Sequence, residues 1–413
     1  MRTSIPFLAG FLAGLLVPSS WADVLVVPDD HARLEDAVAA ADGGDVILVR
    51  TTAEQGAFGV RVTKPLTIVG DPICNVDLRF GGIELDGPGG GVVTLVNVAV
   101  DYLSADENGY PSLWGGGFDE LHLVGSRIVH QNLAPSGLIT SSHPALDLDG
   151  PMLVTVVDSE LVGGNAGSDV CAPPTLYQNG REAILAPEAT VILLDSTATG
   201  GNGGRDGFGG VTLDMCCASC ECPSDLASWG GAGGDGVVAA ELHALRSTVR
   251  GGEGIAWYAF PSGTDANPAG TPTYCGERPD GARYVVSGSL VVSAASPLFA
   301  DTTRPPLSGE WGLGWDVQAL PTCRPGESGC YLGATGLLLA SVTPLRRPFA
   351  FGAYWGYLDV GTIGLVATFP ATRPSELQLA VPSDLRLVGT TVTAQVALST
   401  GYLSPPVVGT IVP

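Results

Sequence analysis

A serine followed four residues later by two glycines recurs along the chain, and this motif most constrains the fold. It is plainest in VVDSELVGGNAG, LLDSTATGGNGG and ALRSTVRGGEG, whose serines are Ser159, Ser196 and Ser247. Weaker copies surround Ser126 and Ser289. A short unit that recurs cannot bury its apolar face alone, and it does so by stacking on its neighbours. The repeat therefore predicts a stack of similar units that share one core.

Each copy holds a short strand segment followed by a longer one. Residues 145–148 precede 153–161, residues 183–185 precede 191–197, and residues 236–238 precede 242–249. Apolar residues alternate in the longer segments, as in Val154 and Val156 or Ile192 and Leu194, which predicts that they face inward. Long loops at residues 169–181, 203–234 and 259–283 follow the same point of successive units and should emerge on one side.

Ahead of the repeat, the sequence predicts short strands and one helix. Residues 24–27 and 46–49 are strand segments, and Asp29 or Asp30 could cap the helix between them. The Gly43-Gly44 pair would end that helix. Its apolar face has helical spacing and consists of Leu34, Ala37, Val38 and Ala41.

This N-terminal stretch resembles the cap and first coil of secreted proteins of the pectin-lyase-like superfamily. The matching residues are 34–41, Gly44-Asp45-Val46-Ile47-Leu48-Val49 and Lys64-Pro65-Leu66-Thr67-Ile68-Val69-Gly70. The resemblance implies an all-β fold, a right-handed parallel β-helix with a short N-terminal capping helix, here over residues 23–298. It includes no catalytic residue.

The sequence changes character at about residue 299. Turn signals separate alternating strands at residues 334–342, 354–360, 364–369, 376–381 and 390–398, which predicts a C-terminal antiparallel β-sandwich over residues 299–413. Thr303-Arg304-Pro305-Pro306 has the composition of a linker. The ending, residues 387–412, resembles a small β-domain of exported proteins from Planctomycetes-like bacteria, which implies an extracellular module.

The first 22 residues have the pattern of a secretion signal. Arg2 precedes an apolar run from Ile5 to Val17, and Ser20-Trp21-Ala22 gives a small-x-small cleavage site. A membrane anchor is the alternative, but the run is shorter than the roughly 20 residues that a span needs. We expect a mature chain from Asp23 that is secreted, at the cell surface or periplasmic, with no membrane span after signal cleavage.

Composition excludes one class of partner. The net charge of -23 argues against nucleic acid, because phosphate contacts need clustered Lys and Arg. An acidic surface instead favours solubility, cation binding or repulsion of other polyanions.

The nine cysteines of an exported chain are interpreted first as disulfide partners. Zinc binding by the CCASCEC cluster is the alternative, although a second, separate C-x-x-C is lacking. The disulfide candidates are Cys171, Cys216, Cys217, Cys220, Cys222, Cys275, Cys323 and Cys330.

The resemblance also implies which catalytic residues to look for. β-Helix enzymes of the superfamily cleave acidic polysaccharides, the lyases with an Asp cluster for calcium and a basic residue, the hydrolases with paired Asp residues. The hydrolase series N-T-D, D-D, H-G and R-x-K is absent as a set, and so is R-x-P-x-x-R. The leading prediction is therefore an exported, non-catalytic binding or structural protein that engages carbohydrate along the side of the β-helix, either an extracellular polysaccharide or a cell-surface component. The alternatives are a polysaccharide lyase or glycoside hydrolase, and a calcium-bridged adhesion or assembly scaffold.

Candidate site residues lie in and beside the Gly-rich turns. Oxygen ligands on tight loops suit calcium, although turns select Asn, Asp and Gly for their own geometry. Exposed tryptophans could stack on sugar rings or could fill the ends of the coils. The binding candidates are Asp169, Asp206, Asp235, Glu253, Trp229 and Trp257, and possible calcium ligands are Asn202, Asp206 and Asp235.

Two further sets complete the predicted site. His130 and His143 could form an acid/base pair with Asp147 or Asp149, although an isolated His is more often only hydrogen-bonded. A lyase would need an arginine over converging carboxylates, and the arginines to compare are Arg205, Arg246 and Arg250. We expect the repeated serines to be structural, because no His recurs with them to activate a nucleophile.

Overall fold

The computed structural model describes most of the chain. The residues covered are 3–4, 22–50, 59–71, 76–77, 82–104, 110–132, 142–166, 179–203, 232–254, 256–259, 273–277, 281–293, 296–316, 318, 320, 333–342, 345–351 and 354–413. Every cysteine except Cys275 lies outside this part, and of Cys275 and Trp257 only the backbone is described. The disulfide candidates therefore stay predictions.

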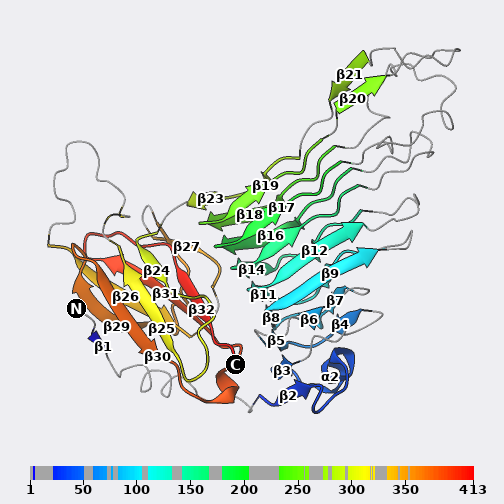
Figure 1. The fold of residues 1–413 in the computed structure, drawn as a ribbon. Helices are drawn as coiled ribbons and strands as arrows, with labels where there is room; N and C mark the ends of the chain where they lie inside the picture. Colours follow the sequence, from blue (N-terminus) through cyan, green and yellow to red (C-terminus); the bar gives the residue numbers. More distant parts are fainter. Residues whose placement is uncertain are drawn as a thin grey trace, which may run out of the picture.

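Parallel strands form the first part of the fold, in a curled sheet of 14 strands and a smaller sheet of 6 (Figure 1). The large sheet contains two series of strands, A and B, which meet at the long strands β16 (Ile184–Leu194) and β18 (Val237–Leu245). The A series also contains β4 (Val60–Val62), β7 (Ile83–Asp86), β10 (Leu113–Gly116), β13 (Leu146–Asp149) and β22 (Tyr284–Val286).

The B series and the smaller sheet complete the stack. The B series adds β2 (Val24–Val27), β3 (Val46–Val49), β5 (Thr67–Gly70), β8 (Val92–Val96), β11 (Glu120–Val124), β14 (Leu153–Val157) and β23 (Leu290–Ser293). The smaller sheet, here the C series, contains β6 (Val76–Asp77), β9 (Val98–Ser104), β12 (Arg127–Asn132), β15 (Glu160–Val162), β17 (Thr197–Thr199) and β19 (Thr248–Arg250).

Along the chain the strands recur in the order A, B, C, and each pairs in parallel with its counterpart in the next repeat. This curled stack is consistent with the β-helix expected from the repeat. One local difference is that residues 184–194 form a single strand, with a register irregularity between Ala186 and Thr190, where the sequence predicts two.

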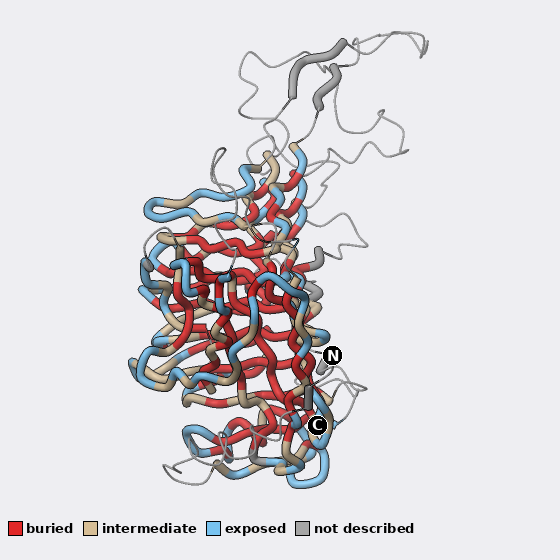
Figure 2. The backbone as a smooth tube through the Cα atoms, turned by 90° about the vertical axis from the view of Figure 1, so that its left-hand side faces the viewer, coloured by how far each residue is buried: buried red, intermediate tan, exposed pale blue. Residues whose placement is uncertain are grey.

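The stack has an apolar interior, which Figure 2 shows as buried backbone running through successive repeats. Val154 and Val156 face inward as predicted. The expectation that Ile192 and Leu194 also face inward is wrong, because both lie in a second cluster on the outer side of the B series. Their neighbours Val191 and Leu193 point inward instead, and the sequence pattern misled because this strand is apolar on both faces.

The predicted helix closes one end of the interior. Helix α2 (Leu34–Ala40) buries Leu34, Ala37 and Val38 against the first strands, as its apolar spacing predicts. The predicted Asp cap is wrong: Arg33 is the N-cap residue and makes no side-chain capping bond. Asp30 instead accepts a hydrogen bond from the backbone N–H of Val26, 2.8 Å away, and so holds the turn that precedes the helix.

The repeated serines stack in a column at the turn between the B and C series. The backbone N–H of Ser126 donates to the hydroxyl of Ser159, Ser159 does the same to Ser196, and Ser196 to Ser247, over 2.9–3.1 Å. Each of these links connects one repeat to the next. The serines satisfy turn amides that would otherwise lack a partner, which confirms their structural role.

The glycine pairs form the opposite corner, where each C strand leads into the next A strand. The N–H of Gly201 donates to Arg181 O over 2.7 Å, Gly201 O accepts from Gly234 N–H, and Gly234 O accepts from Gly252 N–H. A Cβ on Gly201 would overlap the carbonyl oxygen of Gly164, and one on Gly252 would overlap that of Gly201. Glycine is required here because two backbones hydrogen-bond across the stack at a separation that leaves no room for side chains.

The strands from β24 (Leu298–Ala300) onward form two mainly antiparallel sheets around one apolar cluster, which is consistent with the predicted sandwich. We call this part of the chain, from Leu298, the C-terminal unit. One sheet has the order β29 (Gly364–Pro370), β26 (Thr335–Ser341), β31 (Thr391–Leu398) and β32 (Val407–Thr410). The other has β24 (Leu298–Ala300), β25 (Glu310–Trp315) and β30 (Ser375–Ala380), and β1 (Thr3–Ser4) pairs with β30 in parallel.

Two short hairpins and one turn of 3-10 helix complete the described elements: β20 (Ala256–Ala259) with β21 (Thr273–Glu277), β27 (Phe349–Phe351) with β28 (Tyr354–Gly356), and η5 (Leu385–Leu387). No helix within the described ranges is long and apolar enough to cross a membrane.

The C-terminal unit packs against the outer side of the B series. A separate apolar cluster forms the contact between the two parts. Its members include Leu48, Val69, Val96, Val124, Val157, Leu194 and Leu245 from the parallel strands, and Leu345, Tyr357, Val388, Val408 and Val412 from the C-terminal unit. The segment expected to be a linker joins this contact, since Thr303 bonds to Asp158 over 2.8 Å and Pro306 bridges to Val412. The B series is thus buried on both faces in its middle strands, such as β3 and β14, whereas β23 at its end keeps Leu290 and Val292 exposed.

Candidate junction site

A column of residues with left-handed backbone conformation precedes the serine column. Asn97, Asp158, Asp195 and Arg246 have φ between 47° and 55°, and Gly125 at 57° occupies the same place. Gly125, Asp158, Asp195 and Arg246 each stand immediately before a serine of the column, and Asn97 precedes Val98, whose N–H donates to Ser126. The turn therefore presents the side chains of this column one above another at the edge of the C-terminal unit. Asn and Asp tolerate this conformation well, whereas Arg246 is an unusual residue for it.

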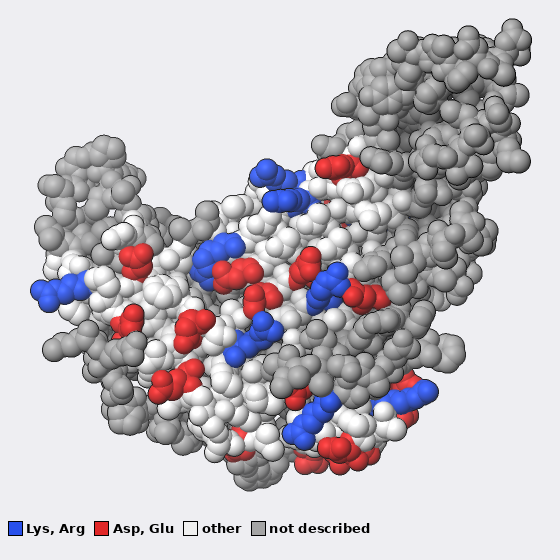
Figure 3. Space-filling view, viewed as in Figure 1, with Lys and Arg blue, Asp and Glu red and all other residues white. Residues whose placement is uncertain are grey.

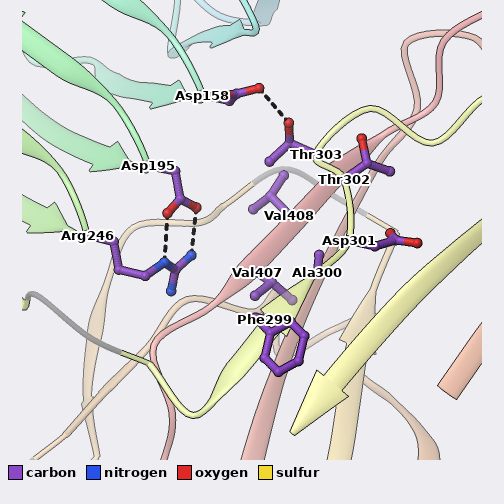
Figure 4. A pocket seen from close by; sticks show the side chains of 10 residues that line it. All are labelled: Asp158, Asp195, Arg246, Phe299, Ala300, Asp301, Thr302, Thr303, Val407 and Val408. Carbon is purple, nitrogen blue, oxygen red and sulfur yellow. Dashed lines mark hydrogen bonds and ion pairs between the residues drawn. The ribbon is translucent and has the colours of Figure 1, made fainter. Parts of the chain in front are cut away.

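Three of these side chains line a pocket of about 340 Å³ between the two parts of the molecule (Figure 4). We call it the junction pocket. The parallel strands contribute Asp158, Asp195 and Arg246, and the C-terminal unit contributes Phe299, Ala300, Asp301, Thr302, Thr303, Val407 and Val408. Its volume lies within the range of about 300–1,000 Å³ that is usual for small-molecule sites.

Ion pairs hold the polar wall of the junction pocket in place. Arg246 makes a bidentate pair with Asp195, with Nε and Nη2 at 2.8 and 2.7 Å from its two carboxylate oxygens. Asp158 accepts a hydrogen bond from Thr303 over 2.8 Å and lies 3.5 Å from Arg304. Each carboxylate faces a cation, so the wall offers hydrogen bonds in fixed directions at little net charge.

The opposite wall is partly apolar. Phe299, on β24, remains 49% exposed although it lies beside Val407 and Val408, and Figure 4 shows its ring across the pocket from Asp195 and Arg246. Asp301 uses one carboxylate oxygen to accept the N–H of Gly312 over 3.0 Å. An exposed ring opposite a row of fixed polar groups suits a ligand that has an apolar face and several hydroxyls.

A wider hollow lies elsewhere along the same junction. It measures about 590 Å³ and is more open, with Asp119, Glu120, Arg346, Phe349 and Asp359 among the residues that line it. Arg346 pairs with Glu120 and lies 3.7 Å from Asp359. Figure 3 shows that acidic and basic side chains are interleaved on this face of the molecule and do not form a patch of one sign.

The predicted calcium residues have backbone partners in the described part of the chain. Asn165 Oδ1 accepts the N–H of Asn202, and Asn202 Oδ1 accepts the N–H of Glu253, both over 2.8 Å. Asp235 Oδ1 accepts the N–H of Ala282 over 2.6 Å. Within the described ranges no group of three or more His, Cys, Asp or Glu is arranged to hold a metal ion. Asp169, Asp206, Trp229 and Arg205 lie outside those ranges, so calcium at this edge stays a prediction.

The structure brings the predicted histidine pair together. The ring centroids of His130 and His143 are 5.5 Å apart, with their planes at 69°. Burial, and next to it the charge of Arg181, lowers the pKa of His143. Burial also raises the pKa of Asp147, and the nearby Asp149 and Glu182 raise it further. Asp147 points outward from β13 and forms the second candidate site, on the outer side of the A series, whereas His130 on β12 is buried at the corner between the C and A series.

An aromatic pair that the sequence did not single out lies on the same outer side. Trp114 on β10 stacks on Tyr110 with centroids 5.3 Å apart and planes at 17°, and Tyr110 is 58% exposed. Strand pairing puts Trp114 directly beside Glu84 on β7 and beside Asp147 on β13. A stacked aromatic face between two carboxyls is an arrangement that can bind a sugar ring.

Sequence reasoning missed two signals that point to the junction. A polar residue precedes each of the plainest repeated serines, as Asp158, Asp195 and Arg246 do, and only Arg246 was considered. The tripeptide Glu-Leu-His occurs twice, at 120–122 and 241–243, at equivalent places of two repeats. Arg250, the third arginine to compare, lies on the exposed side of β19, away from the junction pocket.

The comparisons with known proteins add no relative. No protein-family model, no curated protein and no solved structure matches the chain.

Proposed function

We propose that this chain is an exported, non-catalytic binding protein, built on a right-handed parallel β-helix of the pectin-lyase-like type, that engages carbohydrate in the junction pocket. One observation carries the proposal: a pocket on the side of the strand stack in which fixed carboxylate, guanidinium and hydroxyl groups face an exposed phenylalanine ring. The ligand would be an extracellular polysaccharide or another glycosylated cell-surface component.

The strand pattern supports the β-helix. Three series of parallel strands recur in a fixed order, and the serine and glycine columns connect successive repeats at two corners. A helix at the N-terminal end covers the first repeat, as in the family that the sequence resembles. Such a scaffold holds the residues of a long shallow site in fixed positions, which reduces the entropy lost on binding.

The lining chemistry supports a sugar as the ligand. A pyranose ring has an apolar face of C–H groups and a rim of hydroxyls, which matches the Phe299 ring opposite Asp195 and Arg246. Carboxylates accept hydrogen bonds from hydroxyls and guanidinium groups donate them. Asp158, Asp195 and Asp301 outnumber the one arginine that lines the pocket, so neutral glycans suit it better than polyanionic ones.

The same geometry supports binding without cleavage. Asp195 is held by both nitrogens of the Arg246 fork, and Asp158 by Thr303 and Arg304. Carboxylates held in this way by guanidinium and hydroxyl groups accept hydrogen bonds in fixed directions. The carboxyls of the junction pocket are therefore suited to recognition.

The test compares matched variants in a glycan-binding screen. The purified mature protein is titrated with neutral and acidic oligosaccharides, with and without calcium, and binding is followed by calorimetry. Phe299→Ala should weaken binding by up to about 10-fold, which is the order of one lost aromatic contact of about 0.5–1.5 kcal/mol. Phe349→Ala removes a comparably exposed ring from the wider hollow and should leave binding unchanged. Equal losses in both variants would place the site elsewhere.

A polysaccharide-cleaving enzyme is the second candidate, and the raised pKa of Asp147 favours it. A half-buried carboxyl close to two other carboxyls has the character of a general acid, and Trp114 in the next strand could orient a sugar. The same oligosaccharides are incubated with wild type and with Asp147→Asn, and reducing or unsaturated ends are measured. Release of ends by wild type that Asp147→Asn abolishes would establish this candidate and replace the first.

A further inference from the structure

Two buried histidines lie where the C-terminal unit covers the B series. His122 on β11 and His243 on β18 each follow a Glu-Leu pair and occupy the same outward column, in register through Thr155 and Ile192. Their exposures are 1% and 0%. We call them the junction histidines. Each one lies in a contact between the two parts of the molecule, and the proposed binding role uses neither.

The hydrogen bonds fix the form of both rings. Nε2 of His122 is 2.9 Å from a carboxylate oxygen of Glu120, and Nε2 of His243 is 3.2 Å from Glu241. A carboxylate only accepts, so Nε2 carries the proton in each ring. In the neutral ring Nδ1 is then an acceptor, and it faces the hydroxyl of Thr155 in His122 and the hydroxyl of Tyr357, at 2.9 Å, in His243.

The C-terminal unit supplies the groups that close over these rings. Tyr357 bonds to His243, and Trp355 packs edge-on against the same ring with centroids 4.9 Å apart. Arg346 pairs with Glu120, the partner of His122, and lies 3.7 Å from Asp359 of its own unit. The charged groups around the junction histidines are thus Glu120 and Glu241 beneath them and Arg346 and Asp359 above.

We infer that the junction histidines make the docking of the C-terminal unit acid-sensitive. A second proton converts Nδ1 into a donor that points at a hydroxyl which already donates to it. Tyr357 would then have to turn its O–H away from the ring, inside a contact that leaves Tyr357 only 2% exposed. Release of the C-terminal unit removes Tyr357 from the His243 ring and exposes both charged rings to water, so acid favours the undocked arrangement.

The direction of the titration agrees with this geometry. Burial lowers the pKa of both junction histidines, although the paired glutamates oppose the shift, and Arg346 lowers that of His122 further. Because the pKa of each histidine is lower in the docked state than in the released state, the released state takes up the proton first as the pH falls. Docking is therefore strongest above the ordinary pKa of about 6.5 and weakens as the pH falls from there towards the docked value.

This inference concerns the junction pocket as well, and there it rests on the proposed function. The pocket exists only where Asp195 and Arg246 of the stack face Phe299 of the C-terminal unit. Acid release separates these walls, so a glycan bound near neutral pH would dissociate in an acidic compartment. Docking itself is measured without any glycan, which keeps the two proposals separately testable.

The experiment is hydrogen exchange on the full chain at pH 7.5 and 5.0, with rates corrected for the intrinsic effect of pH. A histidine that stays neutral when docked raises the equilibrium constant for release by about 30-fold between neutral pH and pH 5.0, and the two histidines together raise it by at most about 1,000-fold. Exchange in residues 345–351 and 354–359 should therefore rise at pH 5.0 in wild type, while α2 and the A-series strand β7 change little. Unchanged exchange in those two segments would overturn the inference.

The informative variant is His122→Gln with His243→Gln. Glutamine can donate its amide N–H to the glutamate and accept from the hydroxyl, but it does not titrate, so the double variant should lose the response to acid. His31→Gln, outside the junction, should keep it. Should the double variant fail to fold, an NMR titration of the five wild-type histidines decides the question: values for His122 and His243 at or above 6.5 would refute the inference.

Discussion

The outer faces of the A and B series belong to the same repeats but meet different surroundings. The B face presents Val124, Val157, Leu194 and Leu245, and the C-terminal unit buries all of them. The A face presents Glu84, Trp114 and Asp147 in neighbouring strands, and none of these three is fully buried. Stacking fixes only the inward side chains, and it leaves the outward ones free to make either a contact surface or a site.

The largest effect should come from a charge placed on the covered face. Leu194→Asp buries a carboxylate without a partner and should cost about 4 kcal/mol or more of unfolding free energy. Val238→Asp, on the outer side of the A series and one strand further from Asp147, should cost less than about 1 kcal/mol. Urea unfolding of both variants measures the difference, and equal losses would mean that the C-terminal unit does not cover the B face.

The glycine corner should respond almost as strongly, because it belongs to neither outer face. Gly201→Ala places a Cβ against the carbonyl oxygen of Gly164 and should cost about 2–4 kcal/mol through the backbone shift it forces. Gly43→Ala is the matched control, since its nearest heavy atom would be 3.8 Å away. Thermal melts of the two variants should differ clearly, and a stable Gly201→Ala protein would contradict the close backbone contact.

A smaller effect is expected in the serine column. Ser196→Ala removes the hydroxyl that accepts the N–H of Ser159 over 3.1 Å and leaves that buried amide without its partner. The cost should be about 1–3 kcal/mol. Ser196→Thr keeps the hydroxyl and should recover part of it. Should both variants unfold at the wild-type urea concentration, the column would be unimportant for stability.

The smallest effect distinguishes the two faces by pH. The pKa of Asp147 is raised by burial and by Asp149 and Glu182, so its ionised form is disfavoured in the folded chain. Stability from this group is present at low pH and is lost as the pH rises through the raised value. Asp147→Asn should therefore stabilise the protein near pH 7 by less than about 1 kcal/mol, since the site is only half-buried. If Asp147→Asn instead destabilises the protein, Asp147 must make a favourable interaction in the folded chain.

The two faces thus have opposite responses to acid. The A face gains stability from protonation of Asp147, whereas the B face loses it from protonation of His122 and His243. Melting temperatures of wild type, Asp147→Asn and the His122→Gln, His243→Gln double variant between pH 7.5 and 5.0 separate the contributions. The two responses differ because the C-terminal unit covers the side chains of the B face and leaves those of the A face uncovered.

Much of the fold could be predicted from local sequence. The spacing of Leu34, Ala37 and Val38 predicted the helix, and the Ser-x-x-x-Gly-Gly repeat predicted both the stacked strands and the structural role of its serines. Turn residues indicated the strands of the C-terminal unit. The outward direction of Ile192 and Leu194 could not be predicted, because a strand that is apolar on both faces gives no signal for which face is inside.

The candidate site was less accessible to prediction. His130, His143 and Asp147 were considered together, and the structure places the two histidines side by side. The junction pocket was not foreseen, because Asp158 and Asp195 are far from Phe299 in sequence and meet it only when the C-terminal unit docks. Residues such as Asn202 and Asp235, selected for their turns, have side chains that bond to backbone amides.

Local sequence is sufficient to specify the repeating unit and its two hydrogen-bonded corners, because serine hydroxyls and bare glycine backbones act between neighbouring repeats. Which outer face became a contact, and where a pocket formed, depended on the packing of the whole molecule. Those outcomes depend on the C-terminal unit, whose residues approach the stack over sequence separations such as the 114 residues between His243 and Tyr357. Local patterns do not encode contacts at that range, since they arise from the fit of two finished surfaces.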